Sequence, residues 1–460
     1  MTTKSRHTDA SHCPKPLLFI AMPFGVKEEP GGSRVVDFDR IHGECLEPAA
    51  EAANVESIRA DEEALGGIIH KTMYERLLLA EIVVADLTFA NANVFYELGI
   101  RHAARPRSTI LIYAKLGQLP FDVAPVRAIP YEIGPEGEVN DPDALRAAIA
   151  ERLEIAKNGD GSDSPLFQLL TDYPGITLPQ DTTEAFRERA RWISELTIRA
   201  NEATRAAPDA AREELAQIEA EIEVLPGVHG ELQVVLMLSY RAIEAWADVV
   251  RLAEALPPRV AELPTVREQL AMALNRRSQP GDRRRAIAIL EAVLEEHGDS
   301  PETLGILGRC HKSRWQEKRE AGDPGAADAL EDAIDAYDRG FATDPRDYYP
   351  GINLLTLLCW RARPEDIERV RSLEPVVTFA VARKGGLRAP DYWTRATVLE
   401  LCALVDDEEA GRRALSAMLD TEPDGWMCKT TADNLDLYAG ALGTGDRWIV
   451  AVAAQLRGWS

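Results

Sequence analysis

Short apolar runs alternate with helix-like segments through the first third of the chain, and this alternation constrains the fold most. Residues 17–21 (LLFIA), 82–85 (IVVA) and 109–113 (TILIY) are apolar almost without interruption. Such strands are typical of parallel sheets covered on both faces, because side chains on either side then point into a core. Residues 38–53 and 67–80 have the 3.6-residue spacing of helices. The pattern predicts an α/β Rossmann-like domain with a parallel sheet.

Strand signals nearly disappear after residue 183, and amphipathic helices follow one another. Residues 285–296 and 326–341 look alike, and the second segment runs into the Asp-Pro pair that often ends the second helix of a tetratricopeptide repeat. Helical hairpins stacked side by side are the expected architecture. We therefore predict an all-α, tetratricopeptide-like helical repeat domain in the second half.

The expected domain boundaries follow from these patterns and from length. A chain of 460 residues is too long for one ordinary core. Gly, Asp and Ser interrupt every periodicity in NGDGSDS at 158–164, which is typical of a linker. The predicted order is a disordered leader (1–15), the α/β domain (16–157), a linker (158–182) and the helical repeat domain (183–460).

Charge and composition exclude several classes of partner. The chain has 52 Lys and Arg against 76 Asp and Glu, a net charge of −24, which disfavours bulk nucleic-acid binding and anionic membranes. No apolar run approaches the roughly 18 residues needed to span a bilayer. The six cysteines form no CxxC pair and no metal-ligand spacing, and no GxGxxG fingerprint is present. We expect a cytoplasmic protein without metal or redox cofactor.

Two carboxylates mark the candidate site. Asp86 follows the apolar run at 82–85, and Glu97 lies in the predicted first turn of the next helix. Ligands of open α/β sheets bind at the carboxyl ends of the strands. Each residue also has a structural interpretation: Asp86 forms an Asx turn with Thr88, and Glu97 complements the helix dipole.

Three further segments are expected near the same edge of the sheet. The loop Met22-Pro23-Phe24-Gly25 follows the first strand, and its Phe24 either stacks on a base or plugs the domain. Arg59 and Asp61 follow another strand and either face the cleft or pair with each other. Asn91 and Asn93 are expected to form a turn and a helix N-cap.

The motifs of the first half resemble a known family. FIAMPFG at 19–25, SIRADE at 57–62, IVVADLT at 82–88 and NVFYELGIRHA at 93–103 are similar to the nucleoside 2-deoxyribosyltransferase and deoxyribohydrolase-like superfamily, which is related in fold to TIR domains. The resemblance covers about residues 16–135. It implies that Glu97 attacks the anomeric carbon and displaces the nucleobase, while Asp86 binds ribose hydroxyls or exchanges a proton with the base.

The same resemblance completes the expected site. Phe121 and Asp122 match the family's PFD element, which closes the pocket. The predicted catalytic residues are Glu97 and Asp86. The predicted substrate-binding residues are Met22, Pro23, Phe24, Gly25, Arg59, Asp61, Asn93, Phe121 and Asp122.

The second half resembles a different family. ALNRR at 273–277, SPETLGILGRCHKSRW at 300–315, DYYPGIN at 347–353 and DYWTRATVLE at 391–400 are similar to the TRAF-binding, tetratricopeptide-like region of apoptosis signal-regulating kinases and their bacterial relatives. The 460 residues contain no Gly-rich loop, HRD or DFG motif, which excludes phosphoryl transfer by them. The resemblance implies stress or immune signalling of the anti-phage type.

Four tryptophans of the second half invite a role in peptide binding. Aromatic residues at helical spacing more often pack between repeats, and we interpret these as core. A concave groove that binds a partner protein or peptide is the default role of such an array. The residues are Trp246, Trp315, Trp393 and Trp426.

Two functions remain open at this level. The first is an N-glycosidase of the deoxyribosyltransferase type that cleaves a nucleoside, nucleotide or NAD-like molecule, with the helical repeats as a regulatory, partner-binding module. The second is a non-catalytic sensor of a nucleotide-like ligand and a signalling scaffold. The resemblance to TIR domains also implies assembly into a homo-oligomer. Function depends on the site, so the fold alone does not separate the two.

Overall fold

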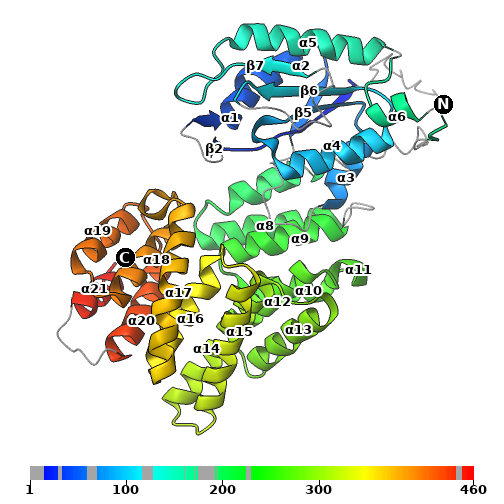
Figure 1. Cartoon of the computed structure of the whole chain (residues 1–460). Helices are drawn as coiled ribbons and strands as arrows, with labels where there is room; N and C mark the ends of the chain where they lie inside the picture. The colour runs from blue at the N-terminus through cyan, green and yellow to red at the C-terminus, as the bar shows by residue number, and fades with distance from the viewer. Residues whose placement is uncertain are drawn as a thin grey trace, which may run out of the picture. The chain divides into compact units, whose positions relative to one another are not determined.

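The computed structural model divides the chain into two compact units, Met1–Ile243 and Glu244–Ser460 (Figure 1). The linker predicted at 158–182 and the domain limits on either side of it stay predictions. All but the last residue of the predicted leader lies outside the described part. The structure describes residues 15–29, 34–59, 70–116, 128–159, 161–170, 172–174, 192–193, 195–223, 229–441 and 448–459.

A five-stranded parallel sheet forms the centre of the first unit. Its spatial order is β4-β1-β5-β6-β7, and Leu18 pairs with Ile82 where β1 lies beside β5. In chain order this is 2-1-3-4-5, so the order reverses between β1 and β5. The strands are β1 Leu17–Ala21, β4 Glu56–Arg59, β5 Ile82–Asp86, β6 Thr109–Ala114 and β7 Ile129–Tyr131.

Both faces of this sheet are covered, as the apolar runs predict. On one face Leu18 and Ile20 of β1 pack against helices that carry Phe38 and Ile149. On the other face Phe19 packs in a cluster with Leu77 and Leu98. Alternate residues of one strand therefore enter two separate cores, and a polar residue at either position would be buried.

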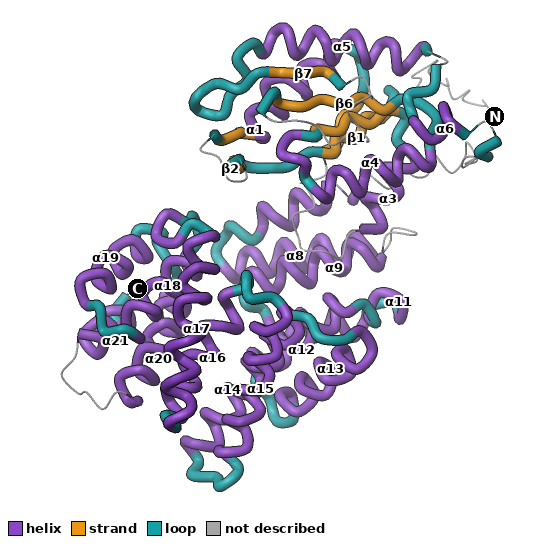
Figure 2. The backbone as a smooth tube through the Cα atoms, in the orientation of Figure 1, coloured by secondary structure: helices purple, strands orange, loops and turns teal. Residues whose placement is uncertain are grey.

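Helices of the first unit flank the sheet on both sides (Figure 2). Residues 38–52 form one helical stretch in which η1 is a π-helical turn, and an antiparallel ribbon of β2 and β3 precedes it. The elements are β2 Val26–Glu28, β3 Val35–Asp37, α1 Phe38–Ile41, η1 His42–Leu46, α2 Glu47–Ala52, α3 His70–Leu79, η3 Thr88–Ala90, α4 Ala92–Ala104, α5 Pro142–Asn158, α6 Pro165–Leu169, α8 Pro208–Glu223 and α9 His229–Ala242.

The second unit is helical throughout its described residues. Consecutive helices pack against each other in pairs, α12 with α13, α14 with α15, α16 with α17, α18 with α19 and α20 with α21. The helices are α10 Trp246–Ala255, α11 Pro258–Ala261, α12 Pro264–Arg277, α13 Asp282–His297, α14 Pro301–Glu320, α15 Ala326–Thr343, α16 Tyr348–Arg361, α17 Pro364–Arg383, η4 Gly386–Arg388, α18 Tyr392–Leu404, α19 Glu408–Leu419, α20 Gly425–Ala441 and α21 Trp448–Arg457.

The predicted order of a parallel-sheet unit followed by a helical region is confirmed. The finer interpretation of the helical pairs as tetratricopeptide repeats stays a prediction. None of the described helices combines the length and the apolar character that crossing a bilayer requires.

Candidate functional site

The reversal of strand order marks the place at the carboxyl edge of the sheet where a ligand is expected to bind. In doubly wound sheets of order 2-1-3-4-5, ligands bind where the order reverses. Here the reversal lies between β1 and β5, so the loop at 22–25 and Asp86 lie at the same edge. The structure thus brings together two of the segments that the sequence nominated.

Asp86 is sealed inside the protein. Its side chain is 0% exposed, and its Oδ1 accepts hydrogen bonds from the amide and hydroxyl of Thr88. The Tyr131 hydroxyl donates to the other oxygen at 2.6 Å, and the Thr88 hydroxyl accepts from the Ala114 amide at 2.9 Å. Burial raises the pKa of Asp86 to about 6, although the bonds from Thr88 and Tyr131 lower it. The Asx-turn interpretation therefore describes the observed geometry.

Arg59 is held by the first loop and the helix after it. Its guanidinium lies 2.7 Å from the Asp39 carboxylate and 3.4 Å from the carbonyl of Pro23. Burial alone would raise the pKa of Asp39, but hydrogen bonds from the Gly25 amide and Arg59 lower it. The described partner of Arg59 is thus Asp39, which the sequence interpretation did not include.

Phe24 projects from the same loop and is 46% exposed. The Lys27 ammonium lies 5.3 Å from the centre of its ring, a cation–π contact. Met22, at the start of the loop, is buried in the core. The buried Met22 therefore anchors the loop in the core, while the ring of Phe24 is exposed to solvent.

Glu97 lies deeper in its helix than the sequence suggested. Helix α4 begins at Ala92, where the N-cap Asn91 accepts hydrogen bonds from the amides of Asn93 and Val94. Glu97 is therefore in the second turn, beyond the strongest influence of the helix dipole. Its side chain is 8% exposed.

Of the remaining predicted residues, the structure describes Asn93 but not Asp61, Phe121 or Asp122. Asn93 is exposed in the first turn of α4. The binding of a nucleoside- or nucleotide-like molecule by the predicted residues stays a prediction.

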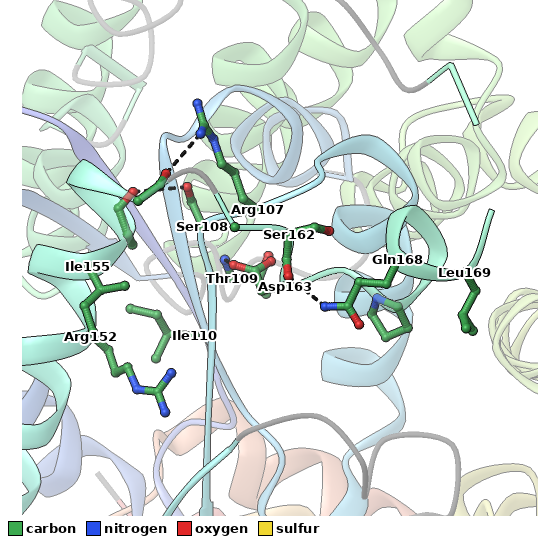
Figure 3. Close-up of a pocket in the computed structure, with 14 residues that line it drawn as sticks. Arg107, Ser108, Thr109, Ile110, Arg152, Ile155, Ser162, Asp163, Gln168 and Leu169 are labelled. Atoms are coloured by element: carbon green, nitrogen blue, oxygen red, sulfur yellow. Dashed lines mark hydrogen bonds between the residues drawn. The ribbon is translucent and has the colours of Figure 1, made fainter. Parts of the chain in front are cut away.

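A cavity of about 710 Å³ lies at the opposite end of β6 (Figure 3). Its wall combines the start of β6, the end of α5 and the segment that leads into α6. Asp163 accepts a hydrogen bond from the Thr109 amide, and the Gln168 side chain donates to the carbonyl of Ser162. These bonds fix the segment against the strand. The cavity is thus separate from the predicted catalytic edge.

A buried polar cluster joins four helices of the second unit. The ammonium of Lys312 on α14 donates to the side-chain oxygens of Asn353 on α16 and Asn434 on α20, at 3.0 and 2.8 Å. Asn434 in turn donates to Glu400 on α18. Burial lowers the pKa of Lys312 and raises that of Glu400. No local sequence pattern indicates this cluster, because its members are far apart along the chain.

The described residues hold no group of three or more His, Cys, Asp or Glu side chains arranged to bind a metal ion. The buried groups above are satisfied mainly by one another. Their arrangement suits support of the fold more than chemistry on a substrate.

A family model described as the MAP3K TRAFs-binding domain matches residues 94–446. The match covers more than three quarters of the chain. This chain belongs to the MAP3K TRAFs-binding domain family. The match begins inside α4, so the likeness of residues 16–135 to deoxyribosyltransferases and TIR domains stays a prediction.

Individual relatives of this MAP3K TRAFs-binding domain protein carry kinase names. Identity to mitogen-activated protein kinase kinase kinase nsy-1 of Caenorhabditis elegans is 31%. The alignment covers 46% of this chain and 15% of the relative. Identity to human mitogen-activated protein kinase kinase kinase 6 is 27% over 68% of this chain and 25% of the relative. Identity to human mitogen-activated protein kinase kinase kinase 5 is 22%, over 89% of this chain and 32% of the relative. The chain thus spans a third or less of these relatives.

These findings overturn the N-glycosidase prediction. The family and its relatives point to a signalling scaffold or a kinase-related role, and not to base cleavage. The prediction was wrong because it carried an activity over from motifs at a sheet edge, and a shared fold does not determine chemistry. The prediction of a TRAF-binding region and of a protein partner is supported.

Proposed function

We propose that this chain is a signalling scaffold that docks a protein of the TRAF class through its helical unit. The family match over residues 94–446 carries the proposal, because it includes every described helix of the second unit except α21. Arrays of packed helices bind partners through extended surfaces and need no catalytic group.

The kinase names of the relatives do not transfer to these residues. The sequence has no Gly-rich loop, HRD or DFG motif, so nothing in it can position ATP in the manner of a protein kinase. The scaffold role is the part of a kinase pathway that the chain can perform. The five cysteines in the described region are free thiols, and we place the scaffold in the cytoplasm.

The test is direct titration of the full chain with a panel of purified TRAF proteins by isothermal calorimetry. We expect saturable binding to at least one of them. An unrelated acidic protein of similar net charge serves as the control for non-specific attraction. If no TRAF protein binds while circular dichroism shows a folded helical chain, the scaffold proposal fails.

A further inference from the structure

Six side chains form an accessible face on the second unit, which we name the arginine–aromatic face. Each comes from a different helix among α10, α12, α14, α16, α18 and α20 (Figure 1). One member of each consecutive pair therefore contributes, together with α10. The residues are Trp246, Arg276, Arg309, Tyr349, Trp393 and Trp426.

Arg276 is at the centre of this face. Its guanidinium carbon lies 6.0 Å from the ring centre of Trp246 and 5.6 Å from that of Trp426. The Trp393 ring centre lies 5.7 Å from that of Trp426. The guanidinium is therefore held between two indoles, and a third indole extends the aromatic surface.

Side chains of this face are exposed to solvent, although nearby protein partly desolvates Arg276. Tyr349 is 41% and Trp393 36% exposed, and Arg276 is exposed as well. The pKa of Arg276 is nevertheless lowered, first because nearby protein replaces water and second because Arg309 repels its charge. A charge that binds beside a partly desolvated cation is screened less than one on a fully hydrated surface.

The two arginines and the three indoles of this face are donors for which the structure gives no acceptor among the described residues. Among the described residues, Arg276 and Arg309 make no hydrogen bond or ion pair, and the indole N–H groups of the three tryptophans donate to nothing. Glu244 attracts Arg276 only from beyond ion-pair distance. The next residue along α12 differs, because Arg277 is paired with Asp282. Two neighbouring cations that make no ion pair, beside N–H donors without an acceptor, form a surface complementary to carboxylates.

We propose that the arginine–aromatic face binds an acidic segment of the partner protein. Arg276 and Arg309 pair with its Asp or Glu carboxylates, and the indoles cover the chain between them. The inference rests on the proposed scaffold function and names the chemistry of its partner. Nucleic acid is the poorer occupant, because its affinity grows with many phosphate contacts and the chain carries a net charge of −24.

The test uses the full chain and labelled ten-residue peptides. Fluorescence anisotropy compares a decaglutamate with an uncharged decaglutamine, with a ten-nucleotide oligothymidylate as the alternative polyanion. We expect the wild type to bind decaglutamate and the Arg276→Gln/Arg309→Gln double variant to bind it at least about tenfold more weakly. Arg339→Gln is the matched control, because Arg339 lies on α15 and is already paired with Asp299. It should bind within about twofold of the wild type.

A second measurement needs no ligand. Removing both of these mutually repelling cations, which make no ion pair, should leave the melting temperature of the double variant equal to or above that of the wild type. Four results would each overturn the inference. The double variant could bind decaglutamate as tightly as the wild type does, or the wild type could bind decaglutamine as tightly as decaglutamate. The wild type could prefer oligothymidylate to decaglutamate, or the double variant could be clearly less stable than the wild type. If a TRAF protein binds wild type and double variant equally, the scaffold proposal stands and this inference fails.

Discussion

At the scale of single residues, Asp86 is a fully buried group of the first unit whose ionisation affects stability. Burial raises its pKa to about 6 from an ordinary value near 3.8. The folded state therefore holds this proton more tightly than the unfolded state, so the contribution of Asp86 to stability falls as pH rises from about 4 to about 6 and changes little above that window. A shift of about two pKa units corresponds to at most about 3 kcal/mol.

Asp86→Asn should remove this pH dependence. The amide is neutral and has the same shape, and it can still accept from Thr88 and contact the Tyr131 hydroxyl. We expect the wild type to gain stability relative to the variant as pH falls from 7 to 4, measured by denaturant unfolding at several pH values. A constant difference between the two proteins across this range would show that Asp86 is not the titrating group.

The residue types at the sheet edge could be predicted, but their partners could not. The sequence placed Asp86 after a strand and named Thr88 as its local hydrogen-bond donor, because an Asx turn spans only two residues. Tyr131 is 45 residues away and reaches Asp86 only once β7 has joined the sheet. Likewise, Asp39 meets Arg59 across 20 residues. Contacts of this kind depend on strand order, which no local pattern encodes.

At the scale of elements, the tight packing of α14 on α15 requires a glycine. A Cβ at Gly308 would lie 2.7 Å from ring carbons of Tyr337, which is fully buried. The ring cannot move without displacing its own neighbours. Close approach of two helices here therefore depends on the missing side chain.

Gly308→Ala should destabilise the second unit by about 1–2 kcal/mol, since overpacking outweighs the better helix propensity of alanine. Calorimetry should show the corresponding transition lowered by several degrees. Gly99→Ala in α4 is the control, because a Cβ there meets nothing within 4 Å. That variant should be neutral or slightly more stable. Equal effects of the two substitutions would contradict the packing argument.

Helix periodicity predicted where helices lie more reliably than where they break. The segment 231–256 has one apolar stripe and suggests a continuous helix. In the structure α9 ends at Ala242 and α10 begins at Trp246, with Glu244 in the left-handed region at φ 57°. Because the residue in this conformation is not a glycine, the residue types at this position do not indicate that the helix breaks there. Similarly, Tyr348 and Tyr349 open α16 directly after the N-cap Asp347.

The same limit applies to the tryptophans. Trp315 is 2% exposed and packs in the core, as spacing predicts for an aromatic residue in such an array. Trp393 is 36% exposed. Spacing along one helix shows which side chains share a stripe, but the neighbouring helices determine whether that stripe is covered.

At the scale of the whole molecule, the chain divides into two compact units, Met1–Ile243 and Glu244–Ser460. The sheet clusters draw on residues up to Leu153, whereas the helical clusters begin at Trp315 and reach Leu456. We expect two calorimetric transitions in the full chain, with Gly308→Ala lowering one and Asp86→Asn affecting the other. Hydrogen exchange followed by mass spectrometry assigns each transition to its unit. A single transition that both substitutions shift equally would contradict this expectation.

The break at Glu244 also bears on how such proteins arise. Because the turn lies where the chain divides into two compact units, recombination there would cut between these units and not through either of them. A lineage could thus exchange the front module for another, or append a catalytic one, and still inherit the docking array intact.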